Sequence, residues 1–182
     1  MGNYLAPVLL ALMLASSAGC HRTPGARAPR RVRYAPEQAS FSVVNGALKL
    51  PGPVVFEAAR DKLSPVSDAS LEVVLDYLTK NPQITLLRIE GHTDTDGNLV
   101  ANETLSEQRA LAVSRWLTDA GVDCHRLMPV GFGQTQPLVA NDTPENKARN
   151  RRVAFVNAAV NGTPIGGVSV DGGGHVAGDP CH

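Results

Sequence analysis

The sequence predicts an α/β domain in which two main helices pack on one mixed four-stranded sheet. Strand and helix patterns alternate between residues 48 and 160, an order typical of such layered domains. Of the 182 residues, 43% are hydrophobic and 4% are aromatic, which suits a compact core of Val, Leu, Ala and Ile. This length allows one domain with short extensions. Basic and acidic residues number 17 each, so no overall charge draws the chain towards nucleic acid.

The first half of the domain is expected to form a strand, a helix and a second strand. Residues 48–56 favour an interrupted strand, because Pro51 and Pro53 have to lie at an edge or a bend. A helix opens at Ser64-Pro65, and Asn81-Pro82 ends it. Its apolar residues recur at spacings of three and four, namely at Leu71, Val74, Leu75 and Leu78. Residues 84–89 are almost continuously apolar, as in a strand covered on both faces.

The second half begins with a polar loop, GHTDTDGN, at residues 91–98. A helix follows, with Gly121 at its end. Thr104 and Glu107 have the spacing of a capping box at its start, and Asn102 is an alternative start. Its apolar residues are Leu105, Ala112, Val113, Trp116, Leu117 and Ala120. Residues 126–132 are expected to form a third strand, and a long loop over 133–150 leads to a fourth at 152–160. The resulting order is βαβαββ.

Residues 1–20 have the pattern of an export signal. The apolar stretch at 5–15 is too short to span a bilayer as a mature helix. Small residues follow, and then Cys20, so the segment resembles the lipobox of bacterial lipoproteins, in which the cysteine becomes the N-terminus and carries acyl chains. His21 after the cysteine favours sorting to the outer membrane. The alternative is a plain cleaved signal followed by an unrelated cysteine.

The two ends of the chain differ in composition from the domain. Residues 21–40 are rich in Pro and Arg and are expected to form a semi-extended linker, either a solvated tether or a contact for anionic groups. Residues 161–182 are rich in Gly and are expected to be disordered. Cys124 and Cys181 could pair in an exported protein, but their spacing alone cannot show that they come within bonding reach.

Two residues of the second half suggest a binding site. Asp94 follows the second strand in a turn flanked by glycine, where an α/β domain places a ligand. Arg109 lies on the apolar stripe of the following helix, at helical spacing from Leu105 and Val113, so it must find an acid or extend to solvent. A carboxylate and a guanidinium near each other would suit a zwitterion, binding its ammonium and its carboxylate. The alternative is that the two residues pair with each other, or that Asp94 caps the turn.

The string GHTDTDGNLVANETLSEQRA, residues 91–110, resembles the signature of OmpA-like C-terminal domains. The likeness continues through VGFGQTQPLVAN (130–141) and NRRV (150–153), and upstream through VVFEAARDKLSP (54–65), so it covers roughly residues 48–160. The family includes the peptidoglycan-associated lipoprotein (Pal), to which the layout is most similar, outer-membrane protein A and the flagellar stator subunit MotB. The resemblance implies an OmpA-like domain over residues 41–160.

The resemblance also implies a ligand and a set of contacts. Family members bind the diaminopimelate of the peptidoglycan stem peptide, which carries a free ammonium and carboxylate. The family's acid falls on Asp94 and its arginine on Arg109. Further contacts fall on Asn102, Thr93, Leu105, Ser106 and, from the NRRV motif, Arg151, for which a salt bridge at the strand start is an equal explanation. Glu57 stands where many relatives have Asp. The implied role is a lipid-anchored outer-membrane protein that tethers that membrane to the wall, with a TolB-like periplasmic protein as a further partner.

The sequence also bears on other classes of function. An OmpA-like adaptor in a larger envelope complex would use the same domain. Asp94, Asp96 and Asn98 resemble the start of a calcium loop, but Leu99 and Leu105 stand where Gly and Glu are needed. His92, Asp94 and His125 lack the compact spacing of a zinc site. No Cys-His or Gly-x-Ser-x-Gly arrangement appears, so we expect neither an enzyme nor a cofactor.

Overall fold

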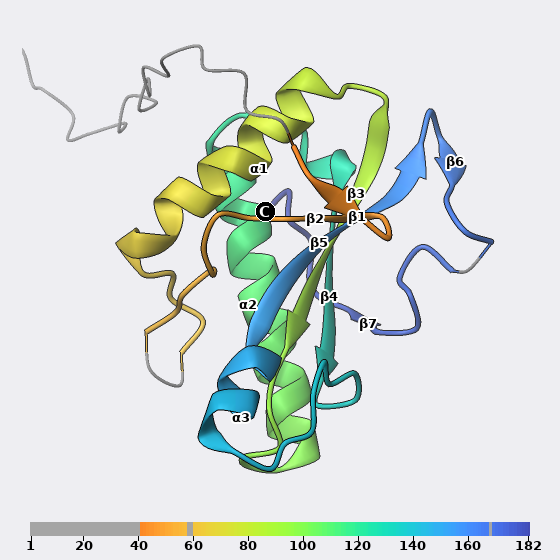
Figure 1. The fold of residues 1–182 in the computed structure, drawn as a ribbon. Helices are drawn as coiled ribbons and strands as arrows, with labels where there is room; N and C mark the ends of the chain where they lie inside the picture. The colour runs from red at the N-terminus through yellow and green to blue at the C-terminus, as the bar shows by residue number, and fades with distance from the viewer. Residues whose placement is uncertain (1–40, 58–59, 168) are drawn as a thin grey trace, which may run out of the picture.

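The computed structural model describes residues 41–57, 60–167 and 169–182. The expected signal segment with Cys20 and the Pro/Arg-rich linker lie outside these residues. The described chain forms one mixed sheet with its two long helices on the same side, which is the predicted α/β arrangement (Figure 1). Within the described ranges, no helix combines the length and the hydropathy needed to cross a bilayer.

Three long strands form the centre of the sheet. They are β3 (Ile84–His92), β4 (Leu127–Gly133) and β5 (Arg152–Val160). β3 runs parallel to β4 and antiparallel to β5. The short strands β1 (Val43–Val44), β2 (Ala47–Leu48), β6 (Thr163–Pro164) and β7 (His175–Val176) extend it. The order is β1-β2-β5-β3-β4-β7, with β6 paired to β5. Three of the four predicted strands are therefore the middle of a wider sheet.

The helices cover one face of this sheet. α1 (Asp68–Lys80) follows the short 3-10 helix η1 (Pro65–Ser67), and α2 (Leu99–Asp119) packs against β4 and β3. Apolar residues at helical spacing on α1 and α2 meet every second residue of β3. The core between the layers is made mainly of Leu71, Val74, Leu78, Leu87, Ile89, Val113, Leu117 and Phe155.

The prediction of a strand over residues 48–56 is wrong for most of its length. Pairing with β5 stops after β2, and further on the segment makes only an isolated bridge between Phe56 and Leu63. Proline has no N–H to donate to a neighbouring strand, and Pro51 and Pro53 follow β2 directly. The segment is held instead by Ser67, whose Oγ accepts from Val55 N at 2.7 Å and donates to Val55 O at 2.8 Å.

The start of α2 also differs from the prediction. Neither Thr104 nor Asn102 caps it; Asn98 does, and its Oδ1 accepts from Ala101 N at 2.8 Å. An Asn side chain satisfies the free N–H groups of a first turn as well as Ser or Thr does. The helix therefore begins at Leu99, directly after the predicted polar loop, and the last residue of that loop, Asn98, is its N-cap.

The long loop predicted over residues 133–150 contains a further helix, α3 (Pro144–Asn150). Its start has a clear signal in the sequence, because Thr143 Oγ1 accepts from Asn146 N at 3.2 Å and Pro144 occupies the first turn. Its last residue, Asn150, is fully buried and accepts from Leu138 N and Val139 N. This amide fixes the loop that precedes the helix.

The prediction that residues 161–182 are disordered is wrong for the part that the structure describes. We call residues 169–182 the C-terminal strap. Its strand β7 pairs with the outer edge of β4, and Val170 O accepts from Arg88 Nη1 at 2.8 Å. The pairing of Cys124 with Cys181, which the sequence left open, is made, with 5.2 Å between the Cα atoms. A glycine-rich composition favours disorder only where no contact holds the chain in place. In the C-terminal strap, the pairing of β7 with β4 and the disulfide at Cys181 hold it.

Candidate functional site

The loop between β3 and α2 places Asp94 at the end of the central strand. Thr93 N donates to Gly133 O at 2.8 Å, which ties the loop to the end of β4. The Asp94 side chain is 7% exposed and its Oδ1 accepts from Asp96 N at 3.0 Å. This local bond is typical of an aspartate that shapes its own turn. Asp94 is thus held rigidly, at the strand end where we predicted a ligand.

Asp94 forms its ion pair with Arg151. Arg151 Nη1 lies 2.6 Å from Asp94 Oδ2, and the arginine side chain is 46% exposed. Within the described ranges, no direct bond joins Asp94 to Arg109, so the predicted alternative in which these two pair with each other does not hold. The negative charge of Asp94 still interacts with Arg109: it raises the pKa of Arg109 and so partly opposes the effect of burial, which lowers it.

Arg109 projects from α2 over the ring of Phe56, with 5.0 Å between Cζ and the ring centroid. Its Nε donates to Arg60 O at 3.1 Å. Burial lowers the pKa of Arg109, and the positive charge of Arg151 lowers it further, while Asp94 and Asp61 act in the opposite direction. Two guanidinium groups near each other and partly removed from water favour the binding of an anion.

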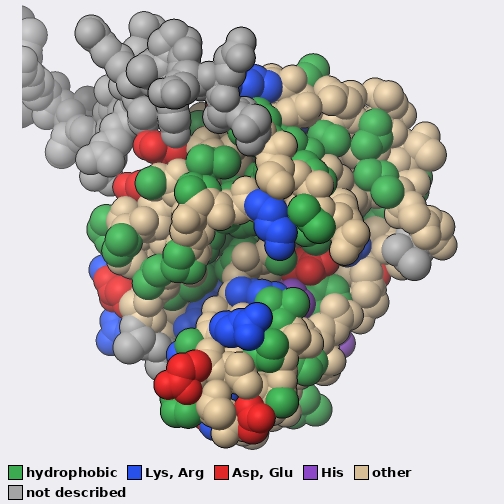
Figure 2. All heavy atoms as spheres, in the orientation of Figure 1, with side chains coloured by type: hydrophobic (Ala, Val, Ile, Leu, Met, Phe, Trp, Pro, Cys, Tyr) green, Lys and Arg blue, Asp and Glu red, His purple; other side chains and the backbone are tan. Residues whose placement is uncertain are grey.

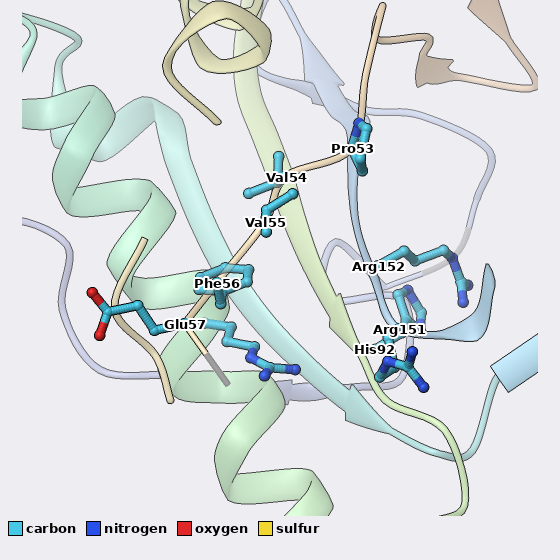
Figure 3. A pocket seen from close by; sticks show the side chains of 9 residues that line it. Pro53, Val54, Val55, Phe56, Glu57, His92, Arg151 and Arg152 are labelled. Carbon is cyan, nitrogen blue, oxygen red and sulfur yellow. The ribbon is translucent and has the colours of Figure 1, made fainter. Parts of the chain in front are cut away.

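A cavity of about 290 Å³ lies beside these groups. Its walls come from the segment before α1, from α2, and from the junction of β3 with β5; they are Pro53, Val54, Val55, Phe56, Glu57, His92, Arg109, Arg151 and Arg152 (Figure 3). In the space-filling view, Lys and Arg side chains gather around a hollow near the middle of this face (Figure 2). Asp94 is not among the lining residues, but its ion-pair partner Arg151 is.

Glu57 contributes little negative charge to the cavity. Its carboxylate points away from Arg151 and Arg152 (Figure 3) and binds Lys62 Nζ at 2.7 Å. Arg152 is anchored by bonds to the carbonyls of Asn150 and Gln136. Burial lowers the pKa of Arg152, and Glu90 partly opposes this. The cavity therefore presents mainly guanidinium groups against an apolar wall.

Two of the predicted contact residues have structural partners. Asn102 is buried, and its Nδ2 donates to Asp94 O, Asp96 O and Gln134 Oε1 at 3.1, 2.9 and 2.8 Å. Ser106 Oγ accepts from Gly133 N at 2.9 Å and donates to Glu103 O. Both side chains fix the loops around Asp94. Their structural role accounts for them without a ligand.

Thr93 and Leu105, the remaining predicted contacts, flank the same loop. Thr93 is buried, and within the described ranges its Oγ1 has no hydrogen-bond partner. Leu105 is half-buried on α2. The structure thus gathers all seven predicted residues around the junction of β3, α2 and β5, but of these only Arg109 and Arg151 line the cavity.

Sequence reasoning missed the polar residues of β3 beside the cavity. Arg88, Glu90 and His92 alternate with the core residues of the strand, so they lie on the face opposite the helices. Burial disfavours the charged form of Glu90, but hydrogen bonds from His92 and Arg88 outweigh it and lower the pKa of Glu90. Burial lowers the pKa of His92, which its bond to Glu90 partly opposes. A neutral His92, stacked on Phe132 at 5.1 Å between ring centroids, is the result.

Within the residues that the structure describes, the side chains of the calcium-like loop and of the His92, Asp94 and His125 set have other partners or lie apart. Asp96 binds Lys147 Nζ at 2.6 Å, and Asn98 caps α2, so two of the residues of the calcium-like loop are otherwise engaged. His125 binds Asp123 beyond the end of α2. In the described part of the chain, His92, Asp94 and His125 do not form a group of ligand atoms close enough to share an ion.

Comparison with known proteins identifies the domain type. A family model described as the OmpA family matches residues 55–151. The probable lipoprotein YiaD of Escherichia coli (strain K12) is 37% identical over 109 residues, which are 60% of this chain and 49% of that protein. The peptidoglycan-binding protein ArfA of Mycobacterium tuberculosis is 35% identical over 119 residues, 65% of this chain and 35% of that protein. The chain thus spans about half or less of these relatives.

Solved structures give the same result for the fold. The peptidoglycan-associated lipoprotein of Burkholderia pseudomallei aligns with a TM-score of 0.51 and 29% identity, over 57% of this chain and 86% of that one. A putative MotB-like protein from Desulfovibrio vulgaris aligns with a TM-score of 0.54 and 31% identity, over 64% of this chain and 78% of that one. The mixed α/β fold of this chain is therefore shared with these two proteins.

Proposed function

The chain belongs to the OmpA family, and from this premise we propose that its domain binds peptidoglycan non-covalently through the diaminopimelate of the stem peptide. The observation that carries the proposal is the cavity beside Asp94, into which Arg109 and Arg151 project. Relatives named as a peptidoglycan-binding protein and as lipoproteins support it. The proposed role is to tether a membrane to the wall, with no catalysis.

Arg109 is the proposed partner of the ligand carboxylate. In the part of the chain that the structure describes, it donates a hydrogen bond from Nε, to Arg60 O. Its two terminal nitrogens can then hold a carboxylate through two parallel bonds. The stacking of Arg109 on Phe56 fixes the plane of the guanidinium, so less conformational entropy is lost when a ligand binds.

Asp94 is the proposed partner of the ligand ammonium. An ionised carboxylate has about four acceptor positions, and Asp94 uses two of them, for Asp96 N and Arg151. Arg151 is the more exposed member of its ion pair, so it can shift when an ammonium approaches while Asp94 stays fixed by its turn. Arg151 then remains near the ligand as a second cation for the carboxylate.

The energetics favour a reversible tether. Each charge-assisted hydrogen bond in a pocket contributes about 1.5–3 kcal/mol, and association itself costs several kcal/mol. A pair of ionic anchors therefore gives weak to moderate affinity for one stem peptide. The wall displays many copies of the ligand and a membrane displays many copies of the protein, so the anchors act collectively.

The test is co-sedimentation of the full chain with isolated sacculi. We expect the wild-type chain to pellet, and Asp94→Ala and Arg109→Ala to lose at least tenfold in bound fraction, because each removes one ionic anchor. Arg115→Ala and Asp119→Ala, exposed positions on α2, are matched controls that should pellet normally. Free diaminopimelate should release the wild type. A wild type that stays in solution, or binding retained in both site variants, would overturn the proposal.

Membrane attachment is a separate part of the proposal. Cys20 would carry the acyl chains and residues 21–40 would span the distance to the wall-binding domain. Cys20→Ser should therefore leave an unprocessed precursor without lipid, visible as a mass difference and as loss of the protein from the outer-membrane fraction. Unchanged fractionation of the variant would contradict lipid anchoring and leave wall binding unaffected.

A further inference from the structure

Two carboxylates of α2 meet an imidazole of the C-terminal strap on the side of α2 that faces β4. His175 Nε2 lies 2.8 Å from Glu103 Oε1, and His175 Nδ1 lies 4.0 Å from Glu107 Oε1. Glu103 and Glu107 are one helical turn apart, so their side chains share a face of α2. One ligand atom from each of the three residues falls within 4.8 Å of the others.

The three side chains are brought together by parts of the fold that are fixed independently. Pairing of β7 with β4 sets His175 opposite Gly131, and so on the side of the sheet that faces α2. The disulfide at Cys181 holds the strap a few residues further on. Gly131 leaves the room that Glu107 occupies, since a Cβ there would come within 2.5 Å of Glu107 Cγ. The fold therefore sets the backbone positions from which all three side chains approach one another.

The charge of this cluster is not balanced by protein groups. In the described part of the chain, the ion pairs of Glu103 and Glu107 are made with His175 and with no Lys or Arg. Even a protonated imidazole supplies one positive charge against two negative ones. Like charges four residues apart on a helix repel each other. A divalent cation would balance both carboxylates at once.

We propose that Glu103, Glu107 and His175 form a binding site for one divalent transition-metal ion of the zinc class. A site with one imidazole and two carboxylates is a donor set that such ions accept. The side chains of Glu103, Glu107 and His175 are 33%, 29% and 68% exposed, so water can complete the coordination. The bound ion would join the strap to α2. This site is separate from the arginine-lined cavity and does not rest on wall binding.

The experiment is a calorimetric titration of the full, disulfide-bonded chain with ZnCl2 in a buffer that does not bind zinc. We expect His175→Ala and the double variant Glu103→Gln/Glu107→Gln each to weaken zinc binding at this site at least tenfold. His182→Ala is the matched control, because it removes another exposed histidine of the strap, and its titration should equal that of the wild type. Zinc should raise the Tm of the wild type and of His182→Ala, and leave that of the site variants unchanged.

The double variant also separates metal binding from folding. Without zinc its Tm should equal or exceed that of the wild type, because two repelling charges are gone. Loss of zinc binding at an undiminished Tm therefore supports the site. Zinc binding of the same affinity and stoichiometry in the wild type and in both site variants would overturn the proposal, and so would equal loss in His182→Ala. In that outcome, the contact of His175 with Glu103 is a hydrogen bond that only fixes the strap.

Discussion

At the scale of single residues, the polar side chains of β3 connect the cavity to the stability of the sheet. His92 lies in the cavity wall and is buried, and its Nε2 contacts Glu90 Oε2 at 3.3 Å. Arg88 binds the other oxygen of Glu90 at 2.7 Å. Burial makes the positive charge of an imidazolium costly, so this arrangement requires a neutral His92 beside an ionised Glu90.

A dependence of stability on pH follows from the lowered pKa values of His92 and Glu90. As the pH falls through the usual value of 6.5 for histidine, the unfolded chain takes up a proton at His92 before the folded chain does. Stability is therefore fully present above this pH and decreases below it. Glu90 adds a further loss below its usual value of 4.5. We expect the Tm to fall between pH 7.5 and pH 5.5, measured by circular dichroism.

His92→Gln tests the assignment, because glutamine is neutral at every pH and can still bond to Glu90. Its Tm should fall less than that of the wild type over the same interval, whatever its value at pH 7.5. His125→Gln, at an exposed position, should keep the wild-type slope. Equal slopes in His92→Gln and the wild type would show that another group titrates.

The sequence motif singled out Asp94 and Arg109, and it offered a salt bridge for Arg151, but it did not identify Arg151 as the partner of Asp94. Arg151 lies 57 residues away along the chain, and its place depends on how β5 pairs with β3. Asn102 and Ser106 belong to the same motif as the site, and spacing alone cannot distinguish a residue that holds a loop from one that contacts a ligand. His92 and Arg152 line the cavity because β3 ends at His92, β5 begins at Arg152, and the two residues are paired in the sheet. This pairing was not visible in the sequence.

At the scale of elements, β3 approaches the backbone of α2 closely at Gly91, a position without a side chain. A Cβ on Gly91 would lie 2.1 Å from Ser106 O, a backbone atom that cannot move independently of α2. The close approach lets Ser106 Oγ reach Gly133 N. It thereby sets the distance between the loop of Asp94 and the helix that carries Arg109.

Gly91→Ala should therefore destabilise the domain by at least about 2 kcal/mol, because overpacking a tight contact forces the backbones apart. Urea unfolding measures this. Gly52→Ala is the matched control: its Cβ would lie 3.5 Å from Ser70 Oγ, an ordinary contact, and its cost should stay within about 0.5 kcal/mol. A Gly91→Ala protein as stable as Gly52→Ala would contradict the close packing of β3 on α2.

The long elements were predictable and the short ones were not, for a physical reason. α1, β3, β4 and β5 carry apolar residues at regular spacing, and each was located to within a few residues. β7 has two residues and pairs through its backbone, which leaves no periodic pattern. α3 carries few apolar residues, but Thr143-Pro144 was a usable signal for its start. The start of α2 was missed because several residues near it can cap a helix. Thr104 and Asn102 were predicted as caps, but Asn98 is the residue that caps α2.

At the scale of the whole molecule, the C-terminal strap closes one edge of the sheet. β4 would otherwise be an edge strand with free N–H and C=O groups, which can pair with another chain. β7 covers part of this edge, and Ala177 N donates to Pro129 O at 2.9 Å. The strap then passes α2 and ends at the disulfide with Cys124. Composition alone could not predict this, because ordering comes from a contact with a residue 57 positions away.

Removing the disulfide should cost about 2–4 kcal/mol, because the bond constrains a long loop of the unfolded chain. The variant to use is Cys124→Ser/Cys181→Ser, since a single substitution would leave a free thiol that can link two chains. Its urea unfolding should match that of the reduced wild type. A chain cut after residue 162 should lose further stability and also self-associate, because the edge of β4 is then open. Sedimentation velocity at rising concentration measures the association. If the cut chain stays monomeric and as stable as the double serine variant, the strap is held by Cys181 alone, and β7 does not protect the edge.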